Sequence, residues 1–255
     1  MQSENIRPIP QRRVREKVDA CMARQDYPGV ERCLRYWLDE ARLGNDARGE
    51  LMVLNELVGH YRKTGERNKA LQCADEALIL LDAQDFGGTV SEGTTCVNIA
   101  TALNAFSENE RAIELFERAR RCYEASPNAD PSLLGGLFNN MALTFVSLGR
   151  YGEARRCYDS AMSYMESVEH GELEQAVTCL NLADLVAAEI GMEAGDREIS
   201  AWLDRAAELL SGSDAPRDGY YAFVCEKCAP TFDHYGYFLD AARLRQEAQH
   251  IYEGT

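Results

Sequence analysis

The sequence predicts an all-α protein, a right-handed superhelical α-solenoid of about six antiparallel helix pairs. Two observations indicate this fold class. Small residues recur at a near-constant interval, since Ala70, Ala112 and Ala154 are spaced by 42 residues (112 − 70 and 154 − 112). Glycine recurs between the two halves of each repeat, as at Gly65 and Gly149. Such self-similarity is typical of stacked helical units that bury a continuous core.

Each repeat contains two predicted helices, which we name the A helix and the B helix. In the A helix large apolar residues stand one turn apart, as Leu57 and Tyr61 do, and form a stripe on one face. A glycine then ends the helix, because it can adopt a positive φ. The B helix combines alanines with one bulky residue, as in Ala154, Tyr158 and Ala161. The small residues predict a close approach of the two helices.

The repeats divide residues 1–255 into six units within one predicted domain. The three central units follow the pattern most closely, and weaker terminal units are expected because one face of each has no neighbour. The predicted units are, in chain order, approximately 11–44, 51–84, 93–126, 135–168, 176–213 and 222–255.

The first three units keep the pattern to different degrees. In the first unit only the B helix is clear, from Leu34 and Trp37. The second unit is complete through its turn at Gly65 and its alanine at Ala70. The third has Ser107 where the glycine of the turn belongs. Helix pairs are therefore predicted for all three, with the first A helix the least defined.

The last three units each carry one local signal. The fourth is preceded by Asp130 and Pro131, which predict an N-cap followed by proline in the first helical turn. The fifth contains about four extra residues within the range 191–196. The sixth has Pro230 inside its A helix, where the ring removes one hydrogen bond and crowds the preceding turn. We expect a kink or a break at Pro230.

These residues resemble the tetratricopeptide repeat (TPR). The clearest match is the run 138–145, followed by Gly149, Ala154 and Tyr158. The interval is longer than the roughly 34 residues of the standard repeat. Together with an Asn-Asn-Met-Ala run, this longer interval resembles the repeats of kinesin light chains. The resemblance covers nearly the whole chain and implies a helical solenoid that binds proteins or peptides, without implying a motor.

Charge restricts the partners. The chain has 27 Lys and Arg against 42 Asp and Glu, giving a formal net charge of −15. Such a surface repels phosphate, so nucleic acid and anionic membranes are not expected partners. One local exception lies near the start, for which a solvated helix face and a site for an acidic tail are the two interpretations. Its members are Arg7, Arg12, Arg13, Arg15 and Lys17.

The sequence favours a cytoplasmic location. Residues 1–8 are polar and contain no apolar signal core, and no stretch approaches the ~18 apolar residues of a membrane-spanning helix. The nine cysteines are odd in number and come without a secretory signal. Most of them are therefore expected to be free thiols.

The Cys225-x-x-Cys228 motif leaves a metal or redox module open as an alternative function. Zinc would need two further ligands, and no second C-x-x-C or H-x3-H follows nearby. Cys96, Cys179 and Cys225 instead recur at one place in the A helix, as small core residues do. The preferred interpretation is core packing, and the sequence predicts no metal ligand and no cofactor.

Enzymatic motifs are lacking. The four histidines lie in different units, and no nucleophile elbow, P-loop, dinucleotide fingerprint or His-Glu-x-x-His run occurs. The sequence therefore predicts a protein that is not an enzyme.

Asparagines recur at the positions expected to face the concave groove, just before the Leu-Ala or Met-Ala step of the A helix. Chance would place fewer than one in the ten such positions. The five found there are Asn55, Asn98, Asn139, Asn140 and Asn181. Asparagine costs about 0.5 kcal/mol against alanine inside a helix, which suggests a compensating use. A carboxamide offers a donor and an acceptor together, and can pair with the backbone of an extended peptide.

The resemblance likewise implies that these asparagines hold a peptide. The alternative is that each one satisfies a neighbouring helix or merely tolerates a polar groove. Thr101 and Leu143 complete the predicted groove, with Arg62 and Lys63 further along towards the turn. This set does not match the basic clamp with which other TPR proteins hold a chaperone's terminal carboxylate.

The sequence thus predicts a non-enzymatic scaffold that captures a protein or peptide segment in the groove lined by A helices. A regulatory receptor for a small signalling peptide is the first alternative; no helix-turn-helix output is seen, so its signal would pass through a partner. The uncovered face of the last unit also makes a homodimer through a terminal repeat an expected possibility.

Overall fold

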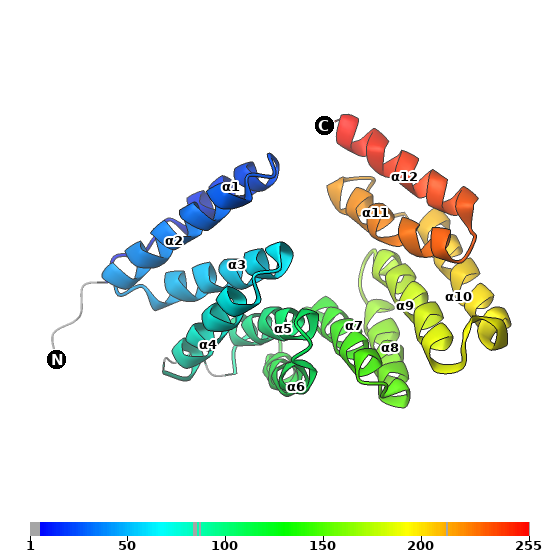
Figure 1. Ribbon diagram of the computed structural model, residues 1–255, viewed down its shortest axis with the longest axis horizontal. Coiled ribbons are helices and arrows are strands. Elements are labelled where there is room, and N and C mark those ends of the chain that lie inside the picture. Colours follow the sequence, from blue (N-terminus) through cyan, green and yellow to red (C-terminus); the bar gives the residue numbers. More distant parts are fainter. Residues whose placement is uncertain (1–5, 84–85, 87, 213, 255) are drawn as a thin grey trace. The chain divides into compact units, whose positions relative to one another are not determined.

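The computed structural model describes residues 6–83, 86, 88–212 and 214–254. Within them every regular element is an α-helix, and consecutive helices form antiparallel pairs (Figure 1). This confirms the all-α class and the helix-pair organisation. Tertiary contacts divide the chain into two compact halves, Met1–Ala129 and Asp130–Thr255, called the N-terminal and C-terminal halves below. The single domain and the right-handed superhelix stay predictions.

The N-terminal half contains the first three A–B pairs at the predicted places. Its helices are α1 (Gln11–Met22), α2 (Tyr27–Leu43), α3 (Ala47–Thr64), α4 (Arg67–Ala83), α5 (Val90–Ala105) and α6 (Asn109–Ala125). The A helix of the first unit, which the sequence barely defined, is thus a regular helix. It packs on α2, whereas α3 packs on α2, α4 and α5.

The C-terminal half contains the other three pairs. Its helices are α7 (Pro131–Ser147), α8 (Tyr151–Met165), α9 (Glu172–Ile190), α10 (Met192–Gly212), α11 (Gly219–His234) and α12 (Phe238–Glu253). Asp130 caps α7 by accepting a hydrogen bond from the Ser132 amide, with Pro131 in the first turn, as the sequence predicts.

Two local features of this half differ from simple expectation. The extra residues of the fifth unit lengthen α10, which has 21 residues and begins directly after Gly191. The sequence predicts a kink or a break at Pro230: the break does not occur, since α11 continues through that residue, and the kink stays a prediction. Cys228, Ala229 and Phe232 are all buried on either side of the proline. Their packing stabilises the helix locally against the missing hydrogen bond.

Each turn from an A helix to a B helix contains one residue with a left-handed backbone. These residues and their φ values are Gln25 (55°), Gly65 (74°), Ser107 (64°), Gly149 (69°), Gly191 (86°) and Gly236 (84°). The glycine turns predicted from the sequence are confirmed. Ser107 adopts the same conformation as the glycines, so the turn is set by its place in the repeat even where a side chain opposes it.

Two aspartates cap helices of the N-terminal half in the same way. Asp26 accepts a hydrogen bond from the Gly29 amide, and Asp46 accepts one from the Gly49 amide. A Cβ atom at Gly29 or Gly49 would lie 2.1 or 2.2 Å from the carboxylate of its cap, which explains both glycines. Asp46 also accepts a hydrogen bond from the Ile9 amide, so it fixes the segment before α1 onto α3.

The same close packing of A and B helices appears in both halves. Gly93 on α5 faces the ring of Tyr123 on α6, where a Cβ would stand 2.5 Å from the ring. Gly135 on α7 faces Met165 on α8, where a Cβ would stand 2.4 Å from the side chain. Both partners follow 30 residues later (123 − 93 and 165 − 135). The absence of a side chain at each glycine thus leaves space for a large side chain from the other helix of the pair.

The core follows the small-plus-large pattern of the B helices. Ala112 and Ala154 are fully buried, and so are the bulky Phe116 and Tyr158 that follow them on α6 and α8. Burial of such rings and of the surrounding aliphatic side chains supplies most of the stability of a helical repeat.

Ion pairs connect successive B helices on the surface of the N-terminal half. We call them the B-helix ion pairs: Glu31–Lys69, Arg42–Glu76, Asp75–Arg111, Asp82–Arg118 and Arg67–Glu108, the last being the N-cap residue of α6. Each joins residues 34 to 41 positions apart, which is about one repeat. Exposed pairs of this kind contribute about 0 to 1 kcal/mol each.

Among the described residues, no helix combines the length and apolar character needed to cross a membrane.

Candidate functional site

The five predicted groove asparagines all lie on A helices, but they differ in exposure. Asn98 on α5 is exposed, while Asn55 on α3, Asn140 on α7 and Asn181 on α9 are half-buried. Asn139 on α7 is buried, with 7% of its surface exposed. One recurring residue type thus occupies two kinds of environment.

Three of the asparagines form hydrogen bonds between neighbouring A helices. The Asn55 carboxamide donates to the Thr95 hydroxyl of α5 at 2.9 Å. Asn139 donates to the Thr178 hydroxyl of α9 at 2.7 Å, in the C-terminal half. Asn181 in turn donates to the Asn139 oxygen at 3.3 Å. These three asparagines therefore bond to neighbouring helices, as in the alternative to peptide binding that the sequence left open.

The remaining two are available to a ligand. Within the described residues, the side chains of Asn98 and Asn140 make no hydrogen bond, whereas Asn139, directly beside Asn140, makes two. Sequence position alone gives no means of separating these neighbours, because both precede the same Met-Ala step.

Alanine substitution should distinguish the asparagines that form hydrogen bonds between helices from those that form none. Asn139→Ala removes a buried carboxamide and leaves Thr178 and Asn181 without their partner, so the free energy of unfolding should fall by about 1 to 3 kcal/mol. Asn140→Ala should leave it unchanged or raise it by about 0.5 kcal/mol through helix propensity. Urea denaturation of both variants measures the difference. Equal effects would show that the Asn139 network contributes nothing.

The other predicted site residues lie on the same helices. The half-buried Thr101 uses its hydroxyl to donate to the Val97 carbonyl of its own helix. Leu143 is 40% exposed on α7. Arg62 and Lys63 are exposed in the last turn of α3, and the Lys63 ammonium lies 5.7 Å from the centre of the Tyr27 ring. Both cations also line a cleft.

Two clefts in the N-terminal half lie beside α1 and α3. The first, of about 530 Å³, has apolar walls from Val18 and Val30 and carries His60; we call it the His60 cleft. The second, of about 670 Å³, carries Asn55 and Asn98 and is called the Asn98 cleft. Volumes of 300 to 1,000 Å³ are typical of sites for small ligands or for a few residues of a peptide.

The clefts carry cations that are not neutralised within the described part of the chain. Many other arginines, such as Arg42, Arg111 and Arg155, form ion pairs, whereas among the described residues the four basic groups of the clefts form none. They are Arg15 and Arg48 in the Asn98 cleft, and Arg62 and Lys63 in the His60 cleft. Glu56 lines both clefts and Asp19 lines the His60 cleft, so only the Asn98 cleft has more basic than acidic side chains in its lining.

Glu56 lines both clefts. Burial raises the pKa of its carboxyl group, Arg15 opposes this effect, and Asp19 adds to it. No hydrogen bond or ion pair satisfies this carboxyl group within the described ranges. The wall shared by the clefts therefore has an acidic group that is costly to keep charged.

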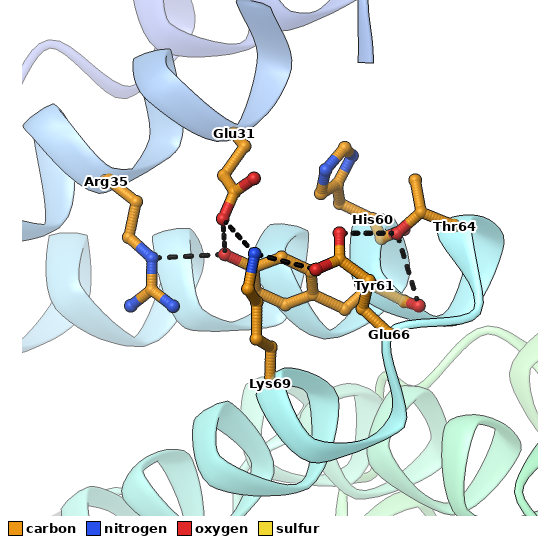
Figure 2. A network of polar contacts seen from close by, with 7 residues as sticks. All are labelled: Glu31, Arg35, His60, Tyr61, Thr64, Glu66 and Lys69. Carbon is orange, nitrogen blue, oxygen red and sulfur yellow. Dashed lines mark hydrogen bonds and ion pairs between the residues drawn. The ribbon is translucent and has the colours of Figure 1, made fainter. Parts of the chain in front are cut away.

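A polar network joins the first two helix pairs (Figure 2). The Tyr61 hydroxyl donates to Glu31 at 2.7 Å and accepts from Arg35 at 3.1 Å. The Lys69 ammonium lies 2.8 Å from Glu31 and 2.7 Å from Glu66. Hydrogen bonds from Lys69 and Tyr61 lower the pKa of Glu31, and burial raises that of Tyr61 to about 12.

Sequence reasoning did not find this network. Glu31, His60, Glu66 and Lys69 belong to two different repeats, and nothing in the sequence singles out these polar residues among the many charged ones. Tyr61 carried a signal, but for core packing alone, and its ring is indeed fully buried. Only the fold brings these polar groups to one place.

The C-x-x-C motif lies in the core of the last pair. Cys225 and Cys228 on α11 are buried free thiols, and burial raises the pKa of each to about 12. Metal binding and thiol exchange both need a thiolate, which this environment disfavours. The geometry therefore favours the packing interpretation over the metal or redox alternative.

Consecutive antiparallel helix pairs, joined by left-handed turns and packed through small residues on the B helices, define the TPR-like repeat proteins. This chain is a TPR-like repeat protein by fold. No family model matches it.

Solved structures share this fold at low sequence identity. BtubC (BKLC) from P. vanneervenii superimposes with a TM-score of 0.56 and 15% identity, over 94% of this chain and 91% of that one. A putative kinesin light chain with nearly identical TPR-like repeats, from Podosopora anserina, gives a TM-score of 0.55 and 15% identity, over 80% of this chain and 95% of that one.

One curated protein is also similar in sequence. Protein KINESIN LIGHT CHAIN-RELATED 1 of Arabidopsis thaliana is 26% identical over 118 residues. The match covers 45% of this chain and 19% of the plant protein, so the chain spans a small part of that relative's length.

Proposed function

We propose that this chain is a non-enzymatic scaffold that captures an extended segment of a partner protein along its A helices. The segment would bind mainly in the pair of clefts beside α1 and α3. The observation that carries the proposal is that these clefts bring together the exposed Asn98 with basic groups that form no ion pair. Kinesin light chain-like repeats among the relatives support a protein-binding role.

The chemistry of the clefts favours an acidic segment. Arg15 and Arg48 can pair with carboxylates, with two parallel hydrogen bonds where the geometry allows. Asn98 can pair with the N–H and C=O of an extended backbone. The apolar wall formed by Val18 and Val30 suits one aliphatic or aromatic side chain. The site therefore selects acidic groups flanking an apolar residue.

Selection from a displayed random-peptide library tests this function. We expect the selected peptides to be rich in Asp and Glu, and Arg15→Ala combined with Arg48→Ala to weaken their binding at least about tenfold, or 1.4 kcal/mol. Fluorescence anisotropy with a labelled selected peptide measures the affinity. Asn98→Ala should weaken the same peptide while leaving the fold intact.

The matched control is Arg156→Ala, because Arg156 is exposed on α8 in the C-terminal half and forms no ion pair among the described residues. Its affinity for the peptide should equal that of the unmodified chain. Peptides without acidic residues, or binding that tolerates the Arg15 and Arg48 changes, would place the binding surface elsewhere.

A receptor for a short signalling peptide would use the same clefts, and the two functions differ in ligand length. If peptides of a few residues bind as tightly as long segments, the receptor function is favoured. A cytoplasmic location, and a homodimer through the last helix pair, remain parts of the proposal. The exposed Phe238 and Leu239 on α12 are compatible with a second copy docking there.

A further inference from the structure

Three ligand-type groups converge at the network of Figure 2. One ring nitrogen of His60 and one carboxylate oxygen each of Glu31 and Glu66 lie within 4.8 Å of one another. They come from separate elements, since Glu31 is on α2, His60 is on α3, and Glu66 is in the turn between α3 and α4. The fold of the first two pairs therefore builds a cluster of one nitrogen and two oxygen donors.

The histidine supplies a second, independent sign of a ligand. His60 is 7% exposed, and its Nδ1 atom is buried without a hydrogen-bond partner in the described structure. A buried imidazole nitrogen without a partner loses about 1 to 3 kcal/mol of hydration that nothing replaces. One nitrogen of the same ring lies within 4.8 Å of both carboxylates, a position from which it can coordinate a metal ion.

Neighbouring groups lie within hydrogen-bond distance of both carboxylates. The Tyr61 hydroxyl donates to Glu31, and the Thr64 hydroxyl lies 3.3 Å from Glu66 and 3.2 Å from the His60 carbonyl, to either of which its single proton can be donated. Hydrogen bonds of this kind orient the ligating groups of metal sites and are commonly needed for their affinity. This arrangement is more typical of a preformed metal site than of exposed acidic residues that lie close together by chance.

A cation already sits between the two carboxylates. The Lys69 ammonium bridges Glu31 and Glu66, and its side chain is 43% exposed, so it can turn outward to solvent. An ammonium group in this position neutralises the two acids in the absence of any other cation. It would also compete with a metal ion for the same oxygens.

We propose that Glu31, His60 and Glu66 bind one divalent transition-metal ion, with zinc as the best fit, and that Lys69 occupies the site when the metal is absent. A set of imidazole and carboxylate donors with room for water suits zinc, whereas calcium and magnesium prefer oxygen alone. Ligands at 2.0 to 2.2 Å around zinc are roughly 3.4 Å apart. The two half-exposed glutamates need only small rotations to reach this spacing.

The metal would tie the first helix pair to the second. It would link α2 with the C-terminal part of α3 and with the turn that follows it, and His60 is also part of the wall of the His60 cleft. Occupancy would therefore stiffen one wall of that cleft. The metal site does not depend on the proposed peptide function, and its test needs no peptide.

Titration calorimetry with zinc chloride on metal-free full-length protein tests the site. We expect one ion per chain with a dissociation constant of about 1 μM or tighter. His60→Gln and Glu66→Gln should each weaken binding at least about tenfold. Lys69→Leu should tighten it about threefold or more, because the competing charge is removed. His170→Gln, at an exposed histidine outside the cluster, should leave it unchanged.

The Lys69→Leu variant makes the test decisive, because a variant that only damages the fold would not bind metal more tightly. Cobalt substitution identifies the ligands, since thiolate ligation gives strong near-ultraviolet charge-transfer absorption and His–Glu ligation does not. The proposal is overturned by a thiolate band, by binding weaker than about 1 mM, or by affinities that do not respond to the His60 and Lys69 changes.

Discussion

Replacing Asp46 with alanine should lower the free energy of unfolding by about 2 to 4 kcal/mol, as measured by urea denaturation followed by circular dichroism. The loss of an N-cap costs about 1 kcal/mol. The Ile9 amide, which donates to the same buried carboxylate, would also lose its partner, at about 1 to 3 kcal/mol. The segment before α1 would be released from α3 as well.

The control for this prediction is Asp26→Ala. Asp26 caps α2 through the same aspartate-to-glycine contact, but it is exposed and holds no second segment. Its removal should cost only about 0.5 to 2 kcal/mol. Asp46→Asn, which keeps one acceptor oxygen, should fall between the two alanine variants. Equal losses for Asp46→Ala and Asp26→Ala would mean that the contact with Ile9 contributes nothing.

Phe116→Ala should have the largest effect of all, lowering the free energy of unfolding by about 3 to 5 kcal/mol. The Phe116 ring on α6 is fully buried, and Ala112 and Ala119 lie one helical turn before and after it on the same buried face. Those alanines cannot fill the space that the ring leaves. Thermal unfolding should show the change as a lower midpoint with the helical content retained at low temperature.

The matched control is the same substitution at Phe238, which begins α12 and is 66% exposed. Phe238→Ala, measured at a concentration at which the chain is monomeric, should change stability by no more than about 0.5 kcal/mol. Phe116→Leu, which leaves a smaller void, should cost less than Phe116→Ala. A loss below 1 kcal/mol for Phe116→Ala would show that the pair closes around the gap.

Much of the fold could be predicted because the repeat imposes the same requirement again and again. The alanine series of Ala70, Ala112 and Ala154 predicted where the B helices pack, and all three are buried. Ser107 was the one exception among the central turns, and it takes the left-handed conformation that glycine has elsewhere. The repeat therefore imposes a positive φ at this turn even where the residue itself disfavours it.

Where the sequence departs from the repeat, local rules were a weaker guide. A proline within a helix argues for a break, yet α11 continues through Pro230 because buried neighbours on both sides hold it. The inserted segment starts at Gly191, and α10 begins at the next residue, so the rest of the insertion lies within a helix. Tertiary packing decided both cases, and a single sequence does not display it.

The candidate site was only partly predictable for a similar reason. The sequence indicated the A-helix positions of Asn139 and Asn140, but not that Asn139 points to Thr178 while its neighbour makes no such contact. The clefts depend on α1, whose pattern was the faintest in the chain. The cluster of Glu31, His60 and Glu66 does not recur in the other repeats of the described chain, so a search for repeated residues does not reveal it.

The B-helix ion pairs make part of the packing of the N-terminal half dependent on salt. Within a helix pair the contacts are apolar and close, whereas between successive B helices many of the surface contacts are exposed charges. Salt screens exposed charges, since the Debye length falls from ~8 Å at 0.15 M to ~3 Å at 1 M, but it does not weaken apolar packing. We therefore expect higher ionic strength to weaken the contacts between successive B helices of this half modestly, while the apolar packing of the helices is unchanged.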